Sequence, residues 1–113
     1  MATGAIPQVD PREARLRANE AGQGSEPAVL IDVREMWEYR QVRAPEATLI
    51  PLSQFIQRFN EIPRDREVLV VCHTGQRSMQ ASMYLARQGY ARVGNVRGGM
   101  DAWEAAGLPV ERG

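Results

Sequence analysis

Two runs of apolar residues constrain the fold of this chain more than any other feature. The first spans residues 28–33 and the second spans residues 67–72, and neither alternates between apolar and polar side chains. A strand with one face in water shows such alternation, whereas a strand covered on both faces is apolar almost throughout. We therefore expect two inner strands of a parallel sheet that carries helices on both faces.

Helical patterns and weaker strand patterns surround these two runs. Asp10 and Pro11 predict the start of a first helix, which Gly22 and Gly24 are expected to end. The further expected helices span residues 35–41, 54–60, 78–88 and 100–106, and the further expected strands span residues 48–50 and 92–96. Helices and strands alternate along the chain, which favours right-handed crossovers. The prediction is an α/β fold with an open, mainly parallel sheet of about four to five strands.

Apolar side chains predict which helix faces pack on the sheet. Ser53 is expected to cap the helix over 54–60, and Trp37 and Trp103 are expected to be packing residues. The helical positions expected to face the sheet are Phe55, Ile56 and Phe59, and then Met79, Ala81, Met83, Leu85 and Ala86.

Composition excludes several classes of function. Acidic and basic residues balance at 14 each, so no overall field favours nucleic acid or a membrane surface. One cysteine and one histidine cannot form an internal disulfide or a Cys/His zinc site, and we expect neither a metal nor another cofactor. We also find no targeting or membrane-spanning segment. These features predict a single domain over residues 1–113 in the cytoplasm.

The only cysteine, Cys72, ends the second apolar run and precedes a predicted helix. Ligands of open parallel sheets bind beyond the carboxyl ends of the strands, and a helix N-terminus favours a thiolate over a thiol. A lone cysteine at a strand end is otherwise usually a small buried hydrophobe. Its neighbours Thr74, Gly75, Gln76, Arg77 and Ser78 favour an anion-binding loop instead, because they are poor core residues.

Within this loop, each residue type has a chemical interpretation. Gly75 permits a positive φ that turns backbone N–H groups inward, and Arg77 supplies a fixed charge that organises the loop or binds a donor anion. His73 either tunes substrate access or is an ordinary solvated residue. Asp32, at the end of the first strand, either bonds to the loop or braces Arg34, and for both a structural role is favoured. Gly98-Gly99 predicts a tight strand-to-helix turn.

Four segments together form a recognisable pattern. They are Ile31-Asp32-Val33-Arg34-Glu35 with Trp37-Glu38-Tyr39, then Ile50-Pro51-Leu52, then Cys72-His73-Thr74-Gly75-Gln76-Arg77-Ser78, and finally Val96-Arg97-Gly98-Gly99-Met100-Asp101-Ala102-Trp103. In this order and spacing they resemble the signatures of the rhodanese family of sulfurtransferases, over nearly the whole chain. One departure is Val42-Arg43-Ala44-Pro45-Glu46-Ala47, where the family commonly has Gly-His-Ile-Pro-Gly-Ala.

The resemblance implies a rhodanese fold and a persulfide on Cys72. The expected reaction is the transfer of a sulfane sulfur from thiosulfate or a related donor to cyanide or a thiol. Cys72 and Arg77 are the expected catalytic residues, with His73, Thr74, Gly75, Gln76 and Ser78 binding the substrate and with Asp32 and Arg34 in support. No second cysteine can resolve the persulfide internally, so release requires an external acceptor.

Two other functions compete with this prediction. A cysteine phosphatase or arsenate reductase also places Cys and Arg around an anion, but it needs a longer loop than the four residues between Cys72 and Arg77. Arsenate reduction usually also needs further cysteines. The second alternative is a binding module of the same fold, or a sulfur carrier that a relay protein loads. Cys72 argues against an inert module but leaves the carrier open.

Overall fold

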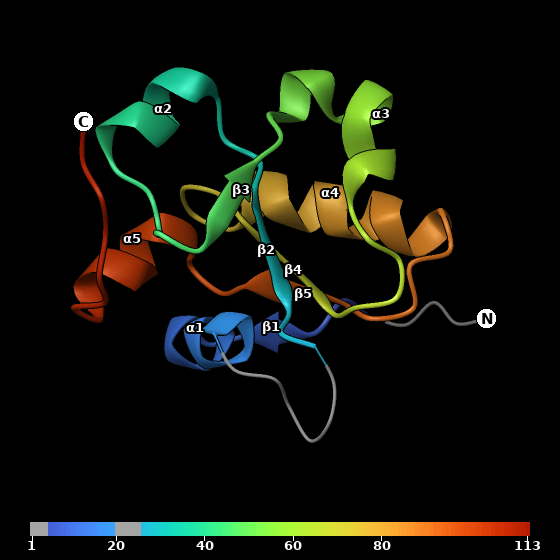
Figure 1. Ribbon diagram of the computed structural model, residues 1–113, viewed down its shortest axis with the longest axis horizontal. Helices are drawn as coiled ribbons and strands as arrows, with labels where there is room; N and C mark the ends of the chain where they lie inside the picture. Colours follow the sequence, from blue (N-terminus) through green and yellow to red (C-terminus); the bar gives the residue numbers. More distant parts are fainter. Residues whose placement is uncertain (1–4, 20–25) are drawn as a thin grey trace.

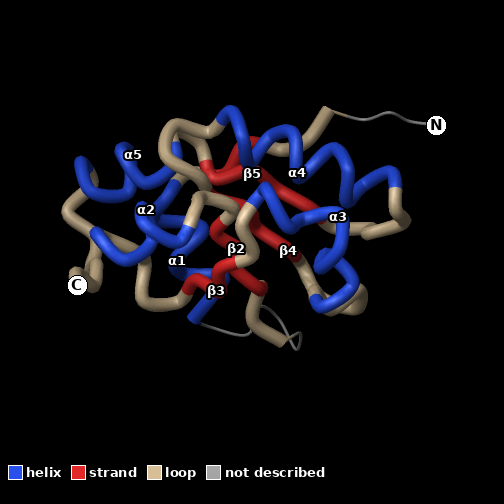
Figure 2. The backbone as a smooth tube through the Cα atoms, turned by 90° about the horizontal axis from the view of Figure 1, so that it is seen from above, coloured by secondary structure: helices blue, strands red, loops and turns tan. Residues whose placement is uncertain are grey.

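The computed structural model describes residues 5–19 and 26–113, which form a parallel sheet between two layers of helices (Figures 1 and 2). The strands are β1 (Gln8–Val9), β2 (Val29–Asp32), β3 (Ala47–Leu49), β4 (Val68–Val71) and β5 (Val93–Val96). In the part of the chain described, they lie in the order β1-β5-β4-β2-β3, and each pair of neighbours is parallel. The predicted α/β fold is confirmed, and the strand that leads to Cys72 lies at the centre of the sheet.

Helices connect the strands and cover both faces. They are α1 (Pro11–Asn19), α2 (Met36–Gln41), α3 (Phe55–Arg58), α4 (Gln76–Arg87) and α5 (Gly99–Ala105). Short 3₁₀ turns over Leu52–Gln54 and Phe59–Glu61 flank α3, so the predicted helix over 54–60 is three short helical pieces. The predicted stops of the first helix, Gly22 and Gly24, lie outside the described residues.

The sheet separates two apolar cores. Successive side chains of a strand point to opposite faces, so neighbours such as Leu30 and Ile31 lie in different cores. One core lies beneath α3 and α4 and includes Leu85, whereas the other lies beneath α1 and α5 and includes Trp103. Figure 1 shows these helix pairs on opposite sides of the strands.

The face of α4 that packs on the sheet differs from the predicted one. Leu85 and Ala81 are buried as expected, but Met83 is 43% exposed and Ala86 is exposed too. The helix buries Ser78 and Ser82 beside Leu85 instead. Apolar spacing failed here because two small serines, which the pattern counts as polar, are fully buried on this helix.

Other expectations for the helices were also wrong. Ser53 does not cap a helix, because its hydroxyl donates to Glu35 Oε1 at 2.9 Å and Pro51 stands at the cap position. Ile56 and Trp37 are exposed rather than packed, at 59% and 64%, while Trp103 is fully buried.

The short strand β1 was not predicted, because two residues cannot show a period.

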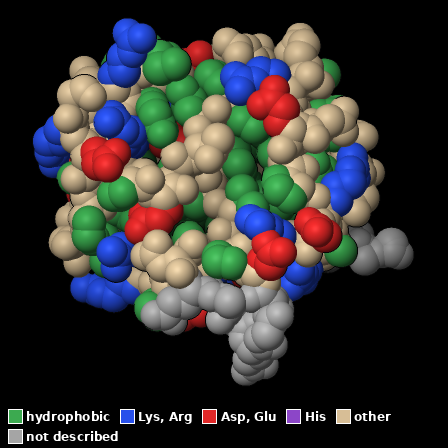
Figure 3. All heavy atoms as spheres, in the orientation of Figure 1, with side chains coloured by type: hydrophobic (Ala, Val, Ile, Leu, Met, Phe, Trp, Pro, Cys, Tyr) green, Lys and Arg blue, Asp and Glu red, His purple; other side chains and the backbone are tan. Residues whose placement is uncertain are grey.

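Charges are interspersed on the surface. On the face drawn in Figure 3, arginines and acidic side chains lie next to one another and do not gather into a patch of one sign. Across residues 5–19 and 26–113, no helix has the length and apolar character to cross a membrane. The same residues contain no group of three or more His, Cys, Asp or Glu side chains placed to hold a metal ion.

Candidate active site

Cys72 follows the central strand β4 directly, and its side chain is buried beneath the loop that leads to α4. Gly75 stands at the N-cap of α4 with φ +108°, in the region that favours glycine. Its backbone N–H donates to Cys72 Sγ at 3.0 Å. The loop therefore directs a backbone N–H group at the sulfur beside a helix N-terminus. The positive φ expected for Gly75 is present.

The carbonyl groups of the loop are bound from outside by α5. Met100 N–H donates to Cys72 O at 2.7 Å, and Asp101 N–H donates to His73 O at 3.1 Å. A Cβ on Gly99 would lie 2.4 Å from Cys72 O, so only glycine permits this approach. The predicted tight turn at Gly98-Gly99 is present, and it also positions the backbone of the loop.

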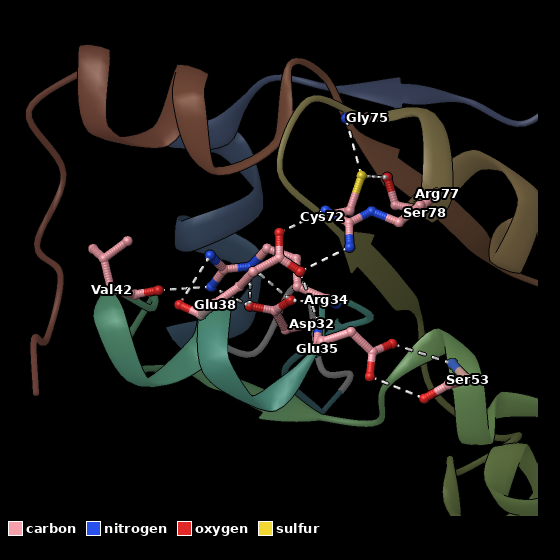
Figure 4. A network of polar contacts seen from close by, with 10 residues as sticks. All are labelled: Asp32, Arg34, Glu35, Glu38, Val42, Ser53, Cys72, Gly75, Arg77 and Ser78. Atoms are coloured by element: carbon pink, nitrogen blue, oxygen red, sulfur yellow. Dashed lines mark hydrogen bonds and ion pairs between the residues drawn. The ribbon is translucent and has the colours of Figure 1, made fainter.

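Arg77 is held by an acidic residue of α2. Its guanidinium donates to both carboxylate oxygens of Glu38, each at 2.8 Å (Figure 4). The hydrogen bond from Arg77 lowers the pKa of Glu38 to about 2, and the same bond raises the pKa of Arg77. Such a two-pronged pair fixes the plane of the guanidinium as well as its position. The first turn of α4 is therefore fastened to α2.

Glu38 was not among the predicted site residues. Its carboxylate also accepts from Glu35 N–H at 2.9 Å, which completes a capping box at the start of α2. The spacing of Glu35 and Glu38 contains the signal for that cap. The bond to Arg77 joins positions 39 residues apart, which local spacing does not reveal.

Asp32 braces Arg34, and the two form a buried ion pair. Asp32 Oδ2 accepts from Arg34 Nη2 at 2.8 Å, and the side chains are 0% and 4% exposed. Arg34 also donates to Val42 O at 2.7 Å and to Glu38 O at 3.4 Å. The pair therefore fixes α2 to the end of β2, and α2 in turn carries the carboxylate that holds Arg77. Of the two roles considered for Asp32, the structure shows the contact with Arg34.

The remaining loop residues differ in exposure. Ser78 is buried, and its Oγ lies 3.2 Å from Cys72 Sγ. Thr74 and Gln76 are exposed, and both border a groove of about 580 Å³ beside the loop. The imidazole of His73 is 56% exposed, and its Nε2 lies 2.8 Å from Asp101 Oδ1. Thus Ser78 approaches the sulfur, whereas His73 lies at the surface.

Arg43, at the position where the family often has histidine, contacts the C-terminal segment. Its backbone forms a two-bond bridge with Glu111, at 3.0 and 2.9 Å, and its Nε lies 3.3 Å from the Glu111 carboxylate. Its guanidinium also lies over the ring of Tyr39, 5.3 Å from the centroid. Arg43 therefore connects Tyr39 of α2 to Glu111.

Comparisons with known proteins found a matching family model and several relatives. A family model described as a rhodanese-like domain matches residues 15–106. A sulfurtransferase of Allochromatium vinosum is 44% identical over 86 residues, which cover 76% of this chain and 80% of that protein. A thiosulfate sulfurtransferase GlpE of Vibrio cholerae is 32% identical over 85% of this chain and 91% of that protein.

Two further matches bear on function and on fold. The putative sulfur carrier protein YrkF of Bacillus subtilis is 38% identical over 66% of this chain and 40% of that protein. The crystal structure of a rhodanese-related protein from Thermoplasma volcanium superimposes with a TM-score of 0.82 at 24% identity, over 94% of this chain and 98% of that one. The second match shows the shared fold alone.

Proposed function

The chain belongs to the rhodanese family, and on that premise we propose that it moves a sulfane sulfur from thiosulfate or a related donor to cyanide or a thiol through a persulfide on Cys72. The observation that carries the proposal is the position of Cys72 Sγ at the N-terminus of α4, where Gly75 N–H donates to it at 3.0 Å. A thiolate, rather than a thiol, is the form of cysteine that attacks sulfur, and helix N-termini favour it.

The first half-reaction forms one bond and breaks another. The Cys72 thiolate attacks the outer sulfur of thiosulfate, the Sγ–S bond forms, and the S–S bond of thiosulfate breaks, so that its electron pair leaves with sulfite. Backbone N–H groups between His73 and Arg77 would then cradle the persulfide anion. Cyanide or a thiolate attacks the outer sulfur in the second half-reaction, and the bonding pair returns to Cys72 Sγ.

In this proposal the loop residues divide by role. Gly75 supplies a backbone donor, and Ser78 contacts the reacting sulfur. Arg77 organises the loop, because its guanidinium is already hydrogen-bonded to both carboxylate oxygens of Glu38. Its side chain remains about one-third exposed, so a donor anion can still reach it. His73, Thr74 and Gln76 line the approach for donor and acceptor. Asp32 and Arg34 support α2.

A sulfur carrier is the second candidate function. The match to YrkF favours a carrier, because that relative is named a putative sulfur carrier protein. The matched residues cover 40% of its length. A carrier would receive sulfur from a protein persulfide rather than from thiosulfate and would pass it to a relay partner. Either function suits a reducing compartment such as the cytoplasm, where an external thiol is available to release the sulfur.

Mass spectrometry of the intact protein tests the proposal. Incubation with thiosulfate should add one sulfur atom to the unsubstituted chain and none to Cys72→Ser, and cyanide should remove it as thiocyanate. Loading by a persulfide donor but not by thiosulfate would support the carrier instead. No added sulfur from either donor, together with hydrolysis of an aryl phosphate, would falsify sulfur transfer and favour the phosphatase.

A further inference from the structure

The hydroxyl of Ser78 lies between the reacting sulfur and a buried amide of β5. Ser78 Oγ is 3.2 Å from Cys72 Sγ, and it is also hydrogen-bonded to Asn95 Oδ1 (Figure 4 draws the contact with the sulfur). Both Ser78 and Asn95 are buried, at 0% and 2% exposure. A hydroxyl carries one proton, so it can donate to only one of these two acceptors at a time.

The orientation of the Asn95 amide decides where that proton goes. Asn95 Nδ2 donates to Gly75 O at 3.3 Å and to Gln8 Oε1 at 3.1 Å. A backbone carbonyl only accepts, so the NH₂ group must face Gly75 and the amide oxygen must face Ser78. An amide oxygen also only accepts, and therefore the Ser78 O–H donates to Asn95.

This arrangement leaves Ser78 Oγ facing Cys72 Sγ with a lone pair. A lone pair accepts from an S–H group, but it does not stabilise a thiolate. If the hydroxyl turned toward a thiolate, the buried Asn95 oxygen would lose the donor that the described structure gives it, which is unfavourable. The thiolate of Cys72 and the amide of Asn95 thus compete for one proton.

We propose that Asn95 is a positioning residue, which holds the Ser78 proton away from Cys72 and so leaves the thiolate without a hydrogen bond from that hydroxyl. The inference rests on the proposed function, in which Cys72 is the nucleophile. A thiolate that accepts fewer hydrogen bonds is the stronger nucleophile, so the withheld bond favours attack on the donor by each thiolate that forms. After transfer the charge lies on the outer sulfur, and the inner sulfur no longer needs the proton. Asn95 therefore favours the sulfur-loaded state over the free thiolate.

Charged groups also lie on the elements next to the Cys72 loop, and they stay the same in the variants used below. They are Asp32 at the end of β2 and Arg34 beyond it, Glu38 of α2, Arg77 of α4, the exposed pair His73 and Asp101, and Arg97 in the groove beside Gly75. None of these side chains bonds to the Ser78 hydroxyl in the described structure. A change in the titration of the thiol on replacing Asn95 can therefore be separated from the effect of these charges, which is the same in every variant.

Titration of the single thiol tests the proposal. Thiolate formation is followed by ultraviolet absorbance across pH, with Cys72→Ser as the blank at each pH, and by the rate of alkylation with iodoacetamide. Asn95→Ala frees the Ser78 proton for the sulfur, so the midpoint of thiolate formation should move down by about one pH unit. Below the midpoint, that shift corresponds to about a tenfold rise in the thiolate fraction.

A double-substitution cycle separates positioning from a general structural effect. In a Ser78→Ala background, Asn95→Ala should leave the midpoint unchanged, because no hydroxyl remains to redirect. Gln8→Ala is the matched control and should also leave the midpoint unchanged, since Gly75 O still orients the Asn95 amide. An equal downward shift with and without Ser78, or an upward shift in Asn95→Ala, overturns the proposal.

Two further variants keep the test decisive if Asn95→Ala does not fold. Asn95→Leu preserves the approximate volume and should give the same downward shift. Ser78→Ala alone removes only an acceptor for the thiol, so the midpoint should stay the same or fall slightly. A rise of about one pH unit would overturn the proposal, because it would show that Ser78 donates to the thiolate. The titration does not use thiosulfate, so failure of sulfur transfer and failure of this inference give different results.

Discussion

Gly99 lies where the backbone of α5 meets the backbone of the Cys72 loop. An added Cβ would lie 2.4 Å from Cys72 O and 2.5 Å from His73 O, and the residue has φ +60°. Real Cβ atoms do not approach carbonyl oxygens so closely, so any other residue must push the loop away from α5. The position of the sulfur therefore depends on a glycine that carries no chemistry of its own.

Replacing Gly99 by alanine should destabilise the protein and displace the loop. We expect a loss of about 2–4 kcal/mol of unfolding free energy in Gly99→Ala, from backbone strain and from the clash. Gly107→Ala is the matched control: Gly107 also has a positive φ, +75°, but its added Cβ meets no atom within 4 Å. It should lose only about 1 kcal/mol, the cost of the left-handed conformation. Urea unfolding measures both, and equal losses would show that the close approach does not matter.

At the scale of secondary structure, the strands were easier to predict than the helix faces. The inner strands β2 and β4 were found because both faces are covered and their apolar runs are continuous. The two-residue strand β1 pairs with β5 from the other end of the chain, which a local pattern cannot show. The sheet-facing side of α4 was partly missed because its serines are buried.

The candidate site shows the same division between local and distant contacts. The loop from Cys72 to Ser78 is contiguous in sequence, so its residue types alone predicted an anion-binding turn. Glu38 and Asn95 reach that loop from α2 and β5, respectively. Their roles depend on how the elements pack, and nothing in their local sequence distinguishes them from a capping residue and a strand residue.

Glu38 connects α2 to α4 through Arg77, and removing its charge should loosen the loop. We expect Glu38→Gln to lower kcat/KM for sulfur transfer by about tenfold, or about 1.4 kcal/mol, because Arg77 loses its two-pronged partner. Glu61→Gln is the control, since Glu61 also binds an arginine, Arg58, but lies exposed beyond α3. It should leave kcat/KM unchanged. Equal activity of the two variants would show that the pair with Arg77 is not needed.

The same pair predicts a dependence of stability on pH. Folding lowers the pKa of Glu38 from 4.5 to about 2, because the carboxylate is hydrogen-bonded to Arg77. A lowered pKa in the folded state adds stability above pH 4.5, and this contribution is lost as the pH falls toward 2. The difference in unfolding free energy between the unsubstituted chain and Glu38→Gln should therefore be constant above pH 4.5 and shrink below it. Urea titrations at several pH values measure this difference, and one that grows on acidification would contradict the assignment.

Considered as a whole, the molecule has two cores that share one sheet. Each inner strand contributes side chains to both: Leu69 of β4 belongs to the core with Trp103, and its neighbour Val70 belongs to the core with Leu85. Neither helix layer can leave without exposing a face of the same strands. The two layers should therefore unfold together, as small domains with a shared sheet commonly do.

A substitution in one core should be felt equally in the other. Trp37 is exposed, so Trp37→Phe leaves Trp103 as the fluorescent reporter of the core beneath α1 and α5. In that background, Leu85→Ala beneath α4 should cost about 2–5 kcal/mol, and it should shift the transitions seen by Trp103 fluorescence and by far-UV circular dichroism by the same amount. Met83→Ala, on the exposed side of the same helix, should change either transition by less than about 0.5 kcal/mol. A shift in circular dichroism without a shift in Trp103 fluorescence would mean that the layers unfold separately, because the sheet would then remain folded against α1 and α5 after α4 had detached.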